Sequence, residues 1–179
     1  ATSPDMIDTI DRYYKEQNIY DLEIVSTLGL TNDDLNEIAK IDGIDQVEGT
    51  YEKDAIIEND NEEIVVKLLC ANNINVPIVL EGNLPINEDE CVVEDSFLKK
   101  KNKKIGDYID LKVEDSTNDN GDKVNYLKQN KLKIVGTVKS PLYISRNRGT
   151  SNLGSGSVDY FMYISDKNIN ANDIYTRIY

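Results

Sequence analysis

A strict alternation of apolar and polar positions marks one stretch near the middle of the chain. Between Tyr108 and Val113, the apolar residues Ile109 and Leu111 alternate with the charged residues Asp110 and Lys112. Successive side chains of an extended backbone point to opposite faces, so the apolar residues fall on one face and the charged residues on the other. This pattern predicts a half-buried strand.

The N-terminal residues show the spacing of a helix. Ser3 is placed as its cap and Pro4 as its first residue, and the helix is expected to end near Gln17. Its apolar stripe consists of Met6, Ile7, Ile10 and Tyr13 or Tyr14. A second helix is expected after Thr31, which forms a near capping box with Asp34. The expected buried stripe of this helix is Leu35, Ile38 and Ala39.

Strands are expected on both sides of the second helix. Residues 22–26 form the first strand, residues 45–57 the second and residues 62–71 the third, and a polar turn at residues 58–61 joins the last two. The order strand, helix, strand, strand is typical of an α+β fold or of a ferredoxin-like half. It does not indicate a doubly wound parallel sheet.

The middle of the chain is expected to be rich in β-structure. Residues 82–85 form a rigid turn because they begin with a glycine and end with a proline. Residues 91–93 are a short apolar run of strand type, and a turn at residues 106–107 leads into the alternating strand. Between them, Ser96 is placed to cap one or two helical turns through Lys100.

Loops and strands alternate in the C-terminal third. Residues 124–127 are expected to pair with residues 132–138 across a short polar turn. Residues 145–157 are the most loop-like stretch of the chain, because they are rich in Ser, Gly and Asn. Strands are expected to follow at residues 159–164 and 174–179.

The composition indicates a globular chain with a strongly negative charge. The 179 residues suffice for one domain or two small lobes without a disulfide framework. The net charge of -13 argues against binding to nucleic acid and against adsorption to an anionic membrane.

The longest apolar runs are far shorter than the ~20 residues of a membrane span. The chain does not open with an export signal, so any such signal is expected outside it. The lysines among residues 99–104 are interpreted as solvated surface.

The sequence lacks the residue patterns of common active sites. It contains no histidine, which excludes Ser-His-Asp and Cys-His catalysis and imidazole metal ligands. Residues 154–156 lack the third glycine of a dinucleotide loop, and the chain has no Gly-Lys-Ser/Thr phosphate loop. The segment with Asp119 and Asp122 resembles a calcium loop in composition alone. The sequence therefore predicts no catalytic residue, no cofactor and no metal site.

Two cysteines, Cys70 and Cys91, lie in apolar runs of strand type and lack the spacing of metal ligands. Such cysteines are most often buried small side chains. In an oxidising compartment a disulfide between them stays open as the alternative, because the sequence does not fix the distance between their Cα atoms.

The order of these segments resembles one known family. Residues 81–113 run from a Glu-Gly-x-Leu-Pro turn through an acidic spacer, an apolar Cys-Val-Val run, Ser-Phe-Leu-Lys-Lys and Ile-Gly-Asp to the alternating strand. Together with residues 131–144, this order is similar to the extracytoplasmic domain of FtsX-like ABC transporter permeases of Gram-positive type, the MacB-like periplasmic core domain. Further parts of that domain resemble residues 14–22, 28–44, 140–144, 148–150 and 154–164, so the resemblance covers most of the chain.

The resemblance implies an α+β fold with two lobes. Residues 1–71 and 158–179 would build a porter-like lobe of β-α-β units, and residues 72–157 would build a β-rich, sabre-like lobe inserted into it. The family's domain usually continues past the strand that matches residues 173–179, with a further helix and strands. The porter-like lobe of this chain is therefore expected to be incomplete.

The resemblance also implies a location and a function. The domain would lie on the extracytoplasmic face of the cell membrane, without enzymatic activity. It would couple ATP hydrolysis by a cytoplasmic ABC ATPase to movement or export of a substrate, a role called mechanotransmission. The implied partners are that ATPase, a second permease copy and an extracellular protein, peptide or lipid cargo, but no nucleic acid.

The loop of residues 145–157 holds the candidate contact residues. They are Arg146, Arg148, Asn152 and Leu153, and a plain flexible connector is the alternative interpretation of this loop. Two other functions are weighed against the permease. One is a secreted or surface-anchored ligand-binding or adhesion module, which predicts no flanking membrane span. The other is a cell-wall hydrolase, which predicts turnover that depends on a single carboxylate.

Overall fold

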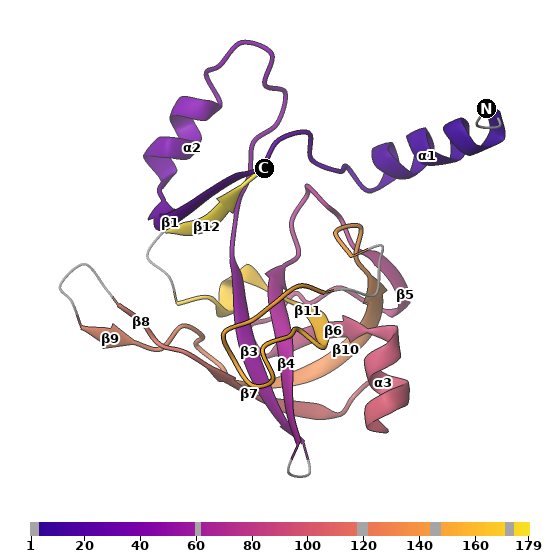
Figure 1. The fold of residues 1–179 in the computed structure, drawn as a ribbon, viewed down its shortest axis with the longest axis vertical. Coiled ribbons are helices and arrows are strands. Elements are labelled where there is room, and N and C mark those ends of the chain that lie inside the picture. Colours follow the sequence, from indigo (N-terminus) through magenta and orange to yellow (C-terminus); the bar gives the residue numbers. More distant parts are fainter. Residues whose placement is uncertain (1–3, 60–61, 118–121, 144–147, 171–173) are drawn as a thin grey trace.

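The computed structural model describes residues 4–59, 62–117, 122–143, 148–170 and 174–179, and its strands form one large sheet, one small sheet and a short hairpin (Figure 1). The helices are α1 (Pro4–Glu16), α2 (Asn32–Ile38) and α3 (Asp95–Lys101), with a 3-10 turn at Asp166–Asn168. The strands are β1 (Ile24–Leu30), β2 (Gly49–Thr50), β3 (Glu52–Asn59), β4 (Glu62–Cys70), β5 (Ile78–Gly82), β6 (Glu90–Glu94), β7 (Tyr108–Val113), β8 (Ser116–Thr117), β9 (Lys123–Val124), β10 (Lys131–Lys139), β11 (Tyr160–Ile164) and β12 (Tyr175–Ile178).

The large sheet closes on itself. Strand β10 pairs with β6 along one edge and with β7 and then β5 along the other. Because β7 also pairs with β3, the strands β10, β6, β11, β4, β3 and β7 form a closed ring, which we call the barrel. Strand β5 is an additional strand on the β10 edge. Figure 1 shows the barrel in the lower part of the molecule and the small sheet above it.

Alternate residues of every barrel strand point into one buried core. In β4, the side chains of Ile64, Val66 and Leu68 belong to this inner cluster. Phe97 of α3 adds to the cluster and meets the ring of Tyr160 edge to face, with 5.3 Å between ring centroids. A second cluster lies on the outer face of the barrel and consists of Leu69, Val92, Val138, Phe161 and Tyr163.

The small sheet brings together the first and the last strand of the described chain. Its strand order is β1-β12-β2, with Ile24 opposite Ile178 and Arg177 opposite Thr50. Tyr51 alone separates β2 from β3, so the backbone passes directly from the small sheet into the barrel.

The structure confirms the α+β fold class and several predicted elements. Helix α1 begins at Pro4, and β4, β6 and β7 lie where the pattern predicts them. In β7 the exposed and buried side chains alternate as expected. The capping box of α2 is also present. The Thr31 side chain accepts a hydrogen bond from the backbone N–H of Asp34, and the Asp34 carboxylate accepts one of 2.7 Å from the backbone N–H of Thr31.

The details of the two short helices differ from the expectation. Glu94, and not Ser96, is the N-cap residue of α3. The Ser96 hydroxyl donates a 2.7 Å hydrogen bond to the Glu94 carboxylate, so it does not cap a backbone N–H. The predicted apolar stripe of α2 is not buried, because Leu35 and Ile38 are half-buried and Ala39 is exposed.

One predicted strand pairing and the bounds of one predicted strand were also wrong. Residues 124–127 do not pair with residues 132–138, because β9 pairs with β8 while β10 is occupied by three other strands. The single strand expected at residues 45–57 is divided into β2 and β3, since each part enters a different sheet.

The predicted lobes share the barrel. Strands β3, β4 and β11 come from the ranges predicted for the porter-like lobe, and β6, β7 and β10 come from the range predicted for the sabre-like lobe. All of them take part in the same closed ring. The division at residues 71/72 and 157/158 stays a prediction. In the structure, the chain is shared between the small sheet and the barrel.

Candidate functional site

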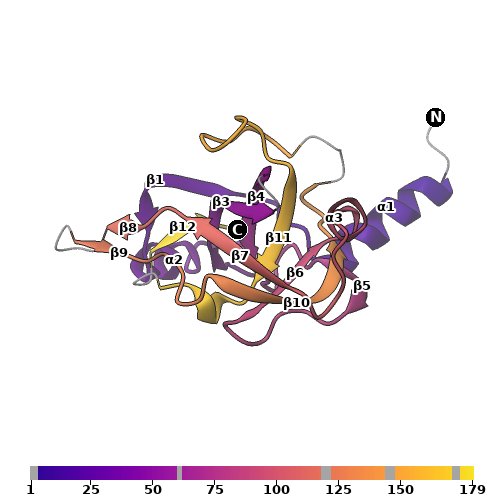
Figure 2. The same cartoon turned by 90° about the horizontal axis from the view of Figure 1, so that it is seen from below.

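A groove of about 860 Å³ lies between α1 and the outer face of the barrel. Figure 2 shows α1 on the side of the barrel that carries α3 and β5. The groove is lined on α1 by Thr9, Ile10, Tyr13 and Tyr14, and on the barrel side by Ile78, Glu94, Asp95, Ser96, Val138, Lys139, Ser140, Tyr143, Arg148 and Phe161. Its volume is within the range of about 300–1,000 Å³ that is typical of ligand pockets.

Helix α1 forms one wall and is held at its C-terminal end. Asn18 ends the helical segment in the left-handed conformation with φ 45°, which asparagine adopts more readily than most residues. The carbonyl groups of Gln17 and Asn18 accept 2.9 Å hydrogen bonds from the backbone N–H groups of Val76 and Asn75. The helix is thus attached to the segment that connects β4 and β5, while Ile10, on its groove side, is 48% exposed.

The opposite wall contains two stacked aromatic rings. Phe161 is buried in the outer cluster of the barrel, and the ring of Tyr143 stacks on it at a centroid distance of 5.2 Å and an angle of 12°. Below them, the hydroxyl groups of Ser140 and Tyr163 share a 2.6 Å hydrogen bond. Burial raises the pKa of Tyr143 and of Tyr163, so both phenols are neutral at physiological pH.

One end of the groove carries an ion pair. The guanidinium of Arg148 donates hydrogen bonds of 3.1 and 2.7 Å to the two carboxylate oxygens of Glu94, and both side chains are nearly buried, at 11% and 13% exposure. The same guanidinium lies over the rings of Tyr143 and Phe161, 5.8 and 5.5 Å from their centroids. Arg148 therefore joins the loop after β10 to the end of β6.

The structure places the predicted contact residues in different surroundings. Arg148 lines the groove and is held by Glu94. Asn152 is exposed and Leu153 is half-buried, and neither lines the groove. Arg146 lies outside the described residues. The sequence alone did not pair Arg148 with Glu94, because 54 residues separate them.

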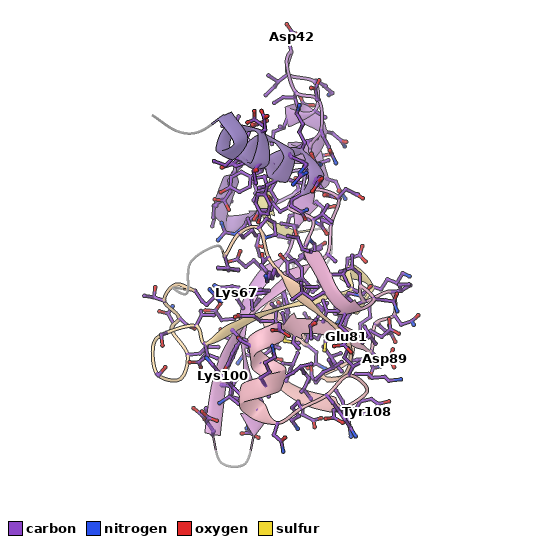
Figure 3. The ribbon with its side chains drawn as sticks, turned by 90° about the vertical axis from the view of Figure 1, so that its right-hand side faces the viewer. Asp42, Lys67, Glu81, Asp89, Lys100 and Tyr108 are labelled. Carbon is purple, nitrogen blue, oxygen red and sulfur yellow. The ribbon has the colours of Figure 1, made fainter. Side chains whose placement is uncertain are left out.

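A chain of charged side chains connects the small sheet to the barrel, and we call it the joint. Its members are Glu23, Arg177, Glu52, Lys67 and Asp54. Arg177 of β12 contacts Glu23 and also Glu52 of β3, with 2.8 Å from its Nε to the Glu52 Oε2 atom. Lys67 of β4 then contacts Glu52 at 3.3 Å and Asp54 at 2.5 Å. Figure 3 shows Lys67 where the upper part of the molecule meets the barrel.

The electrostatics of the joint favour its charged state. Partial burial disfavours the charge of Arg177, but the carboxylates of Glu52 and Glu23 outweigh this effect and raise its pKa above the ordinary value. Thr176, the neighbour of Arg177, adds a direct link, since its hydroxyl accepts a 2.7 Å hydrogen bond from the backbone N–H of Glu52. The interruption of the apolar run of β4 by Lys67 was the one sequence signal for this network.

The described residues contain no centre for metal or thiol chemistry. No group of three or more Asp, Glu, Cys or His side chains that would hold a metal ion is found among them. Cys70 and Cys91 are buried and unpaired with each other, since both lie opposite Ile164 on the two sides of β11. Two strand spacings are about 10 Å, which is too far for a disulfide. Burial raises the pKa of the Cys70 thiol to about 12.

The part of the chain that the structure describes holds no helix with the length and apolar character needed to cross a bilayer. Asp119 of the segment that resembles a calcium loop in composition lies outside the described residues, and Asp122 is exposed.

The sequence matches no model of a protein family and no curated protein. Several solved structures are similar to this one, and two of them are described here. The first is the extracellular domain of the ABC-type transporter YknZ from Gram-positive bacteria, with 13% identity, a TM-score of 0.49, and coverage of 86% of this chain and 73% of that one. The second is the periplasmic region of MacB from Actinobacillus actinomycetemcomitans, with 13% identity, a TM-score of 0.48, and coverage of 87% of this chain.

The chain spans 64% of the MacB region, which is less than two thirds of its length. One solved structure is thus the extracellular domain of an ABC-type transporter, and the other is the periplasmic region of MacB.

Proposed function

We propose that this chain is a non-catalytic extracytoplasmic domain of an ABC transporter permease, which transmits movement from the membrane to the extracytoplasmic side. The resemblance in the sequence motivates the proposal, and the joint is the structural observation that carries it. The small sheet contains both β1 and β12, with Ile24 opposite Ile178, and the barrel lies at the other end of the molecule. A force applied to the small sheet is therefore passed to the barrel through the joint and through the backbone at Tyr51.

The proposed partners follow from this role. A cytoplasmic ABC ATPase would supply the energy through the rest of the permease, and a second permease copy would complete the transporter. The cargo is proposed to be an extracellular protein, peptide or lipid. The net charge of -13 supports a surface that does not bind nucleic acid.

The reading frame on both sides of residues 1–179 gives the first test. The proposal expects an apolar stretch of ~20 residues just before the domain, a set of such stretches after it, and a neighbouring gene for an ATPase. A parent reading frame without any membrane span would overturn the transporter assignment.

A secreted or surface-anchored ligand-binding module is the second candidate, and the groove beside α1 favours it. This candidate needs a ligand that binds the isolated chain but no ATPase partner. The reading frame distinguishes the two candidates, because the module expects no set of membrane spans beside an ATPase gene.

A further inference from the structure

We infer that a single water molecule is bound in a small polar cavity between the small sheet and the barrel, and that the side chain of Asn75 holds it there. The described residues that line this cavity are different from those that line the groove beside α1. The inference goes beyond the proposed function, because a transporter domain and a secreted binding module would use this internal site equally.

The cavity has the size of a single water molecule. A water-sized sphere has about 10 Å³ of space in it, and a volume of about 10–15 Å³ by this measure is enough for one water. The small sheet, the barrel and the segment after β4 all contribute polar residues to its lining. They are Thr50, Glu52, Asn72, Asn75, Tyr163 and Tyr179.

Asn75 provides a buried hydrogen-bond donor that needs an acceptor. Its Oδ1 atom accepts a 3.2 Å hydrogen bond from the backbone N–H of Tyr20. This bond fixes the orientation of the amide, because an NH₂ group cannot accept from an N–H group. The residue is 4% exposed, and within the described part of the chain its Nδ2 atom has no hydrogen-bond partner. Buried polar groups are nearly always paired with protein or with ordered water.

The charges around the cavity favour water over an ion. A cation would meet the N–H groups of Asn75, which cannot act as ligands to it. An anion would meet the carboxylate of Glu52. The cations next to this carboxylate, Arg177 and Lys67, are each bound to two carboxylates and are not free to hold an anion. Water accepts a hydrogen bond from Nδ2 and donates its own hydrogens to oxygen atoms of the lining.

The bound water connects the attachment of α1 to the joint. The backbone N–H of Asn75 donates a 2.9 Å hydrogen bond to the carbonyl of Asn18, at the end of α1. Glu52, on another side of the cavity, is the member of the joint that contacts both Arg177 and Lys67. The side chain of Asn75 thus acts as a positioning residue between these two parts.

A high-resolution crystal structure of the chain of 179 residues tests the inference directly. We expect electron density for one oxygen atom at about 2.7–3.2 Å from the Nδ2 atom of Asn75. A cavity without density would overturn the inference. Density for an ion or a larger molecule would do the same, as would an Nδ2 atom that is bonded to a protein acceptor.

Magnetic relaxation dispersion of the solvent water counts long-lived bound water molecules in solution and locates this one through variants. We expect Asn75→Leu to hold one such molecule fewer than the wild type, because leucine lacks the donor and occupies more of the cavity. Asn102→Leu is the matched control, since Asn75 and Asn102 both have left-handed backbones, with φ 58° and 51°, and Asn102 is exposed. Circular dichroism checks that both variants are folded.

An equal count in Asn75→Leu and the wild type would overturn the inference, and so would an equal loss in Asn102→Leu. If Asn75→Leu does not fold, the crystal structure of the wild type decides alone. The reading-frame test is independent of these results. A transporter whose cavity holds no water keeps its proposed function, and a chain without flanking spans keeps its bound water.

Discussion

Arg148 and Glu94 lie at a point where three parts of the molecule meet. Glu94 is the last residue of β6 and the N-cap residue of α3, and Arg148 follows the loop that leaves β10. The guanidinium lies over two aromatic rings and is bonded to both carboxylate oxygens. Because the pair is nearly buried, removal of one partner leaves the other charge poorly solvated.

We expect Glu94→Ala and Arg148→Ala each to lower the free energy of unfolding by about 3 kcal/mol. The double variant should lose less than the sum of the two, because it leaves no unpaired charge. Equilibrium unfolding in urea measures all three values. Strictly additive losses would show that the two side chains act independently.

The hydrogen bonds of Glu90 predict a pH dependence. Its carboxylate accepts bonds from the backbone N–H groups of Asn87 and Ile86, and these bonds lower its pKa from the ordinary value of 4.5. The folded state thus binds fewer protons at this site than the unfolded state. The stabilisation is present above pH 4.5 and is lost as the pH falls through the lowered pKa of the folded state.

Glu90→Gln removes this titrating carboxylate. Between about pH 5 and pH 3, the free energy of unfolding of the variant should therefore fall less than that of the wild type, and the difference should be about the contribution of this single site. Urea unfolding at a series of pH values measures the slope. Glu88→Gln, in the same segment, is the control for the loss of one negative charge. An unchanged slope in Glu90→Gln would contradict the role of these hydrogen bonds.

Among the elements, β5 depends on a close approach of two backbones. Gly82, its last residue, has φ 76°, and a Cβ atom placed there would lie 2.1 Å from the carbonyl oxygen of Val135. Neither the conformation nor the contact permits a side chain. Gly82 was predicted to begin a turn that ends at Pro85, but it is the last residue of β5, and its lack of a side chain lets β5 pack against the β10 edge.

We expect Gly82→Ala to lower the free energy of unfolding by about 3 kcal/mol, from strain and from the displacement of β5. Gly106→Ala is the matched control, because Gly106 has φ 98° and a Cβ atom added to it would meet no described atom within 4 Å. Its expected cost is about 1 kcal/mol, from the backbone conformation alone. Thermal unfolding compares the two, and equal losses would show that the contact with Val135 is unimportant.

Local patterns in the sequence predicted single elements better than their pairing. The alternation at residues 108–113 and the helical spacing after Pro4 both led to correct elements, since each is a property of adjacent residues. The partners of β10 are set by a closed barrel, and the sequence near residues 124–127 carries no sign of it. The same limit applies to the site. The stripe of α1 was predictable, but the wall that faces it required the long-range pairing of the barrel strands.

For the whole molecule, the joint fixes how the small sheet is oriented on the barrel. Arg177 contacts Glu23, which precedes β1, and Glu52 in β3, and its neighbour Thr176 is bonded to Glu52 as well. If the domain transmits movement, the two parts need to move as one body. An uncharged residue in place of a charged one in the joint should therefore loosen the orientation of the small sheet on the barrel. It should leave the fold of the small sheet and of the barrel unchanged.

Spin labels at Asp42 and Asp89 report on this property, because the first lies at the tip of the upper part and the second on the barrel (Figure 3). We expect one narrow distance distribution in the wild type. Arg177→Met should broaden it at least about twofold, since a partly buried pair holds geometry that an exposed pair does not. Lys40→Met removes an exposed pair outside the joint and serves as the control. A narrow distribution in Arg177→Met would show that the backbone at Tyr51 and the hydrogen bond between Thr176 and Glu52 suffice.

The closed barrel also constrains when the chain can fold. Val65 and Asp159 exchange hydrogen bonds across 94 residues, and β4 pairs with β11 directly beside them. Closing such long loops costs conformational entropy before the stabilising contacts between the strands have formed. Topologies of this kind therefore fold slowly, in about milliseconds to seconds. The ring cannot close until β11 has emerged from the ribosome. A chain that is threaded across a membrane during synthesis would thus stay unfolded for most of its passage, and the barrel would form only on the far side.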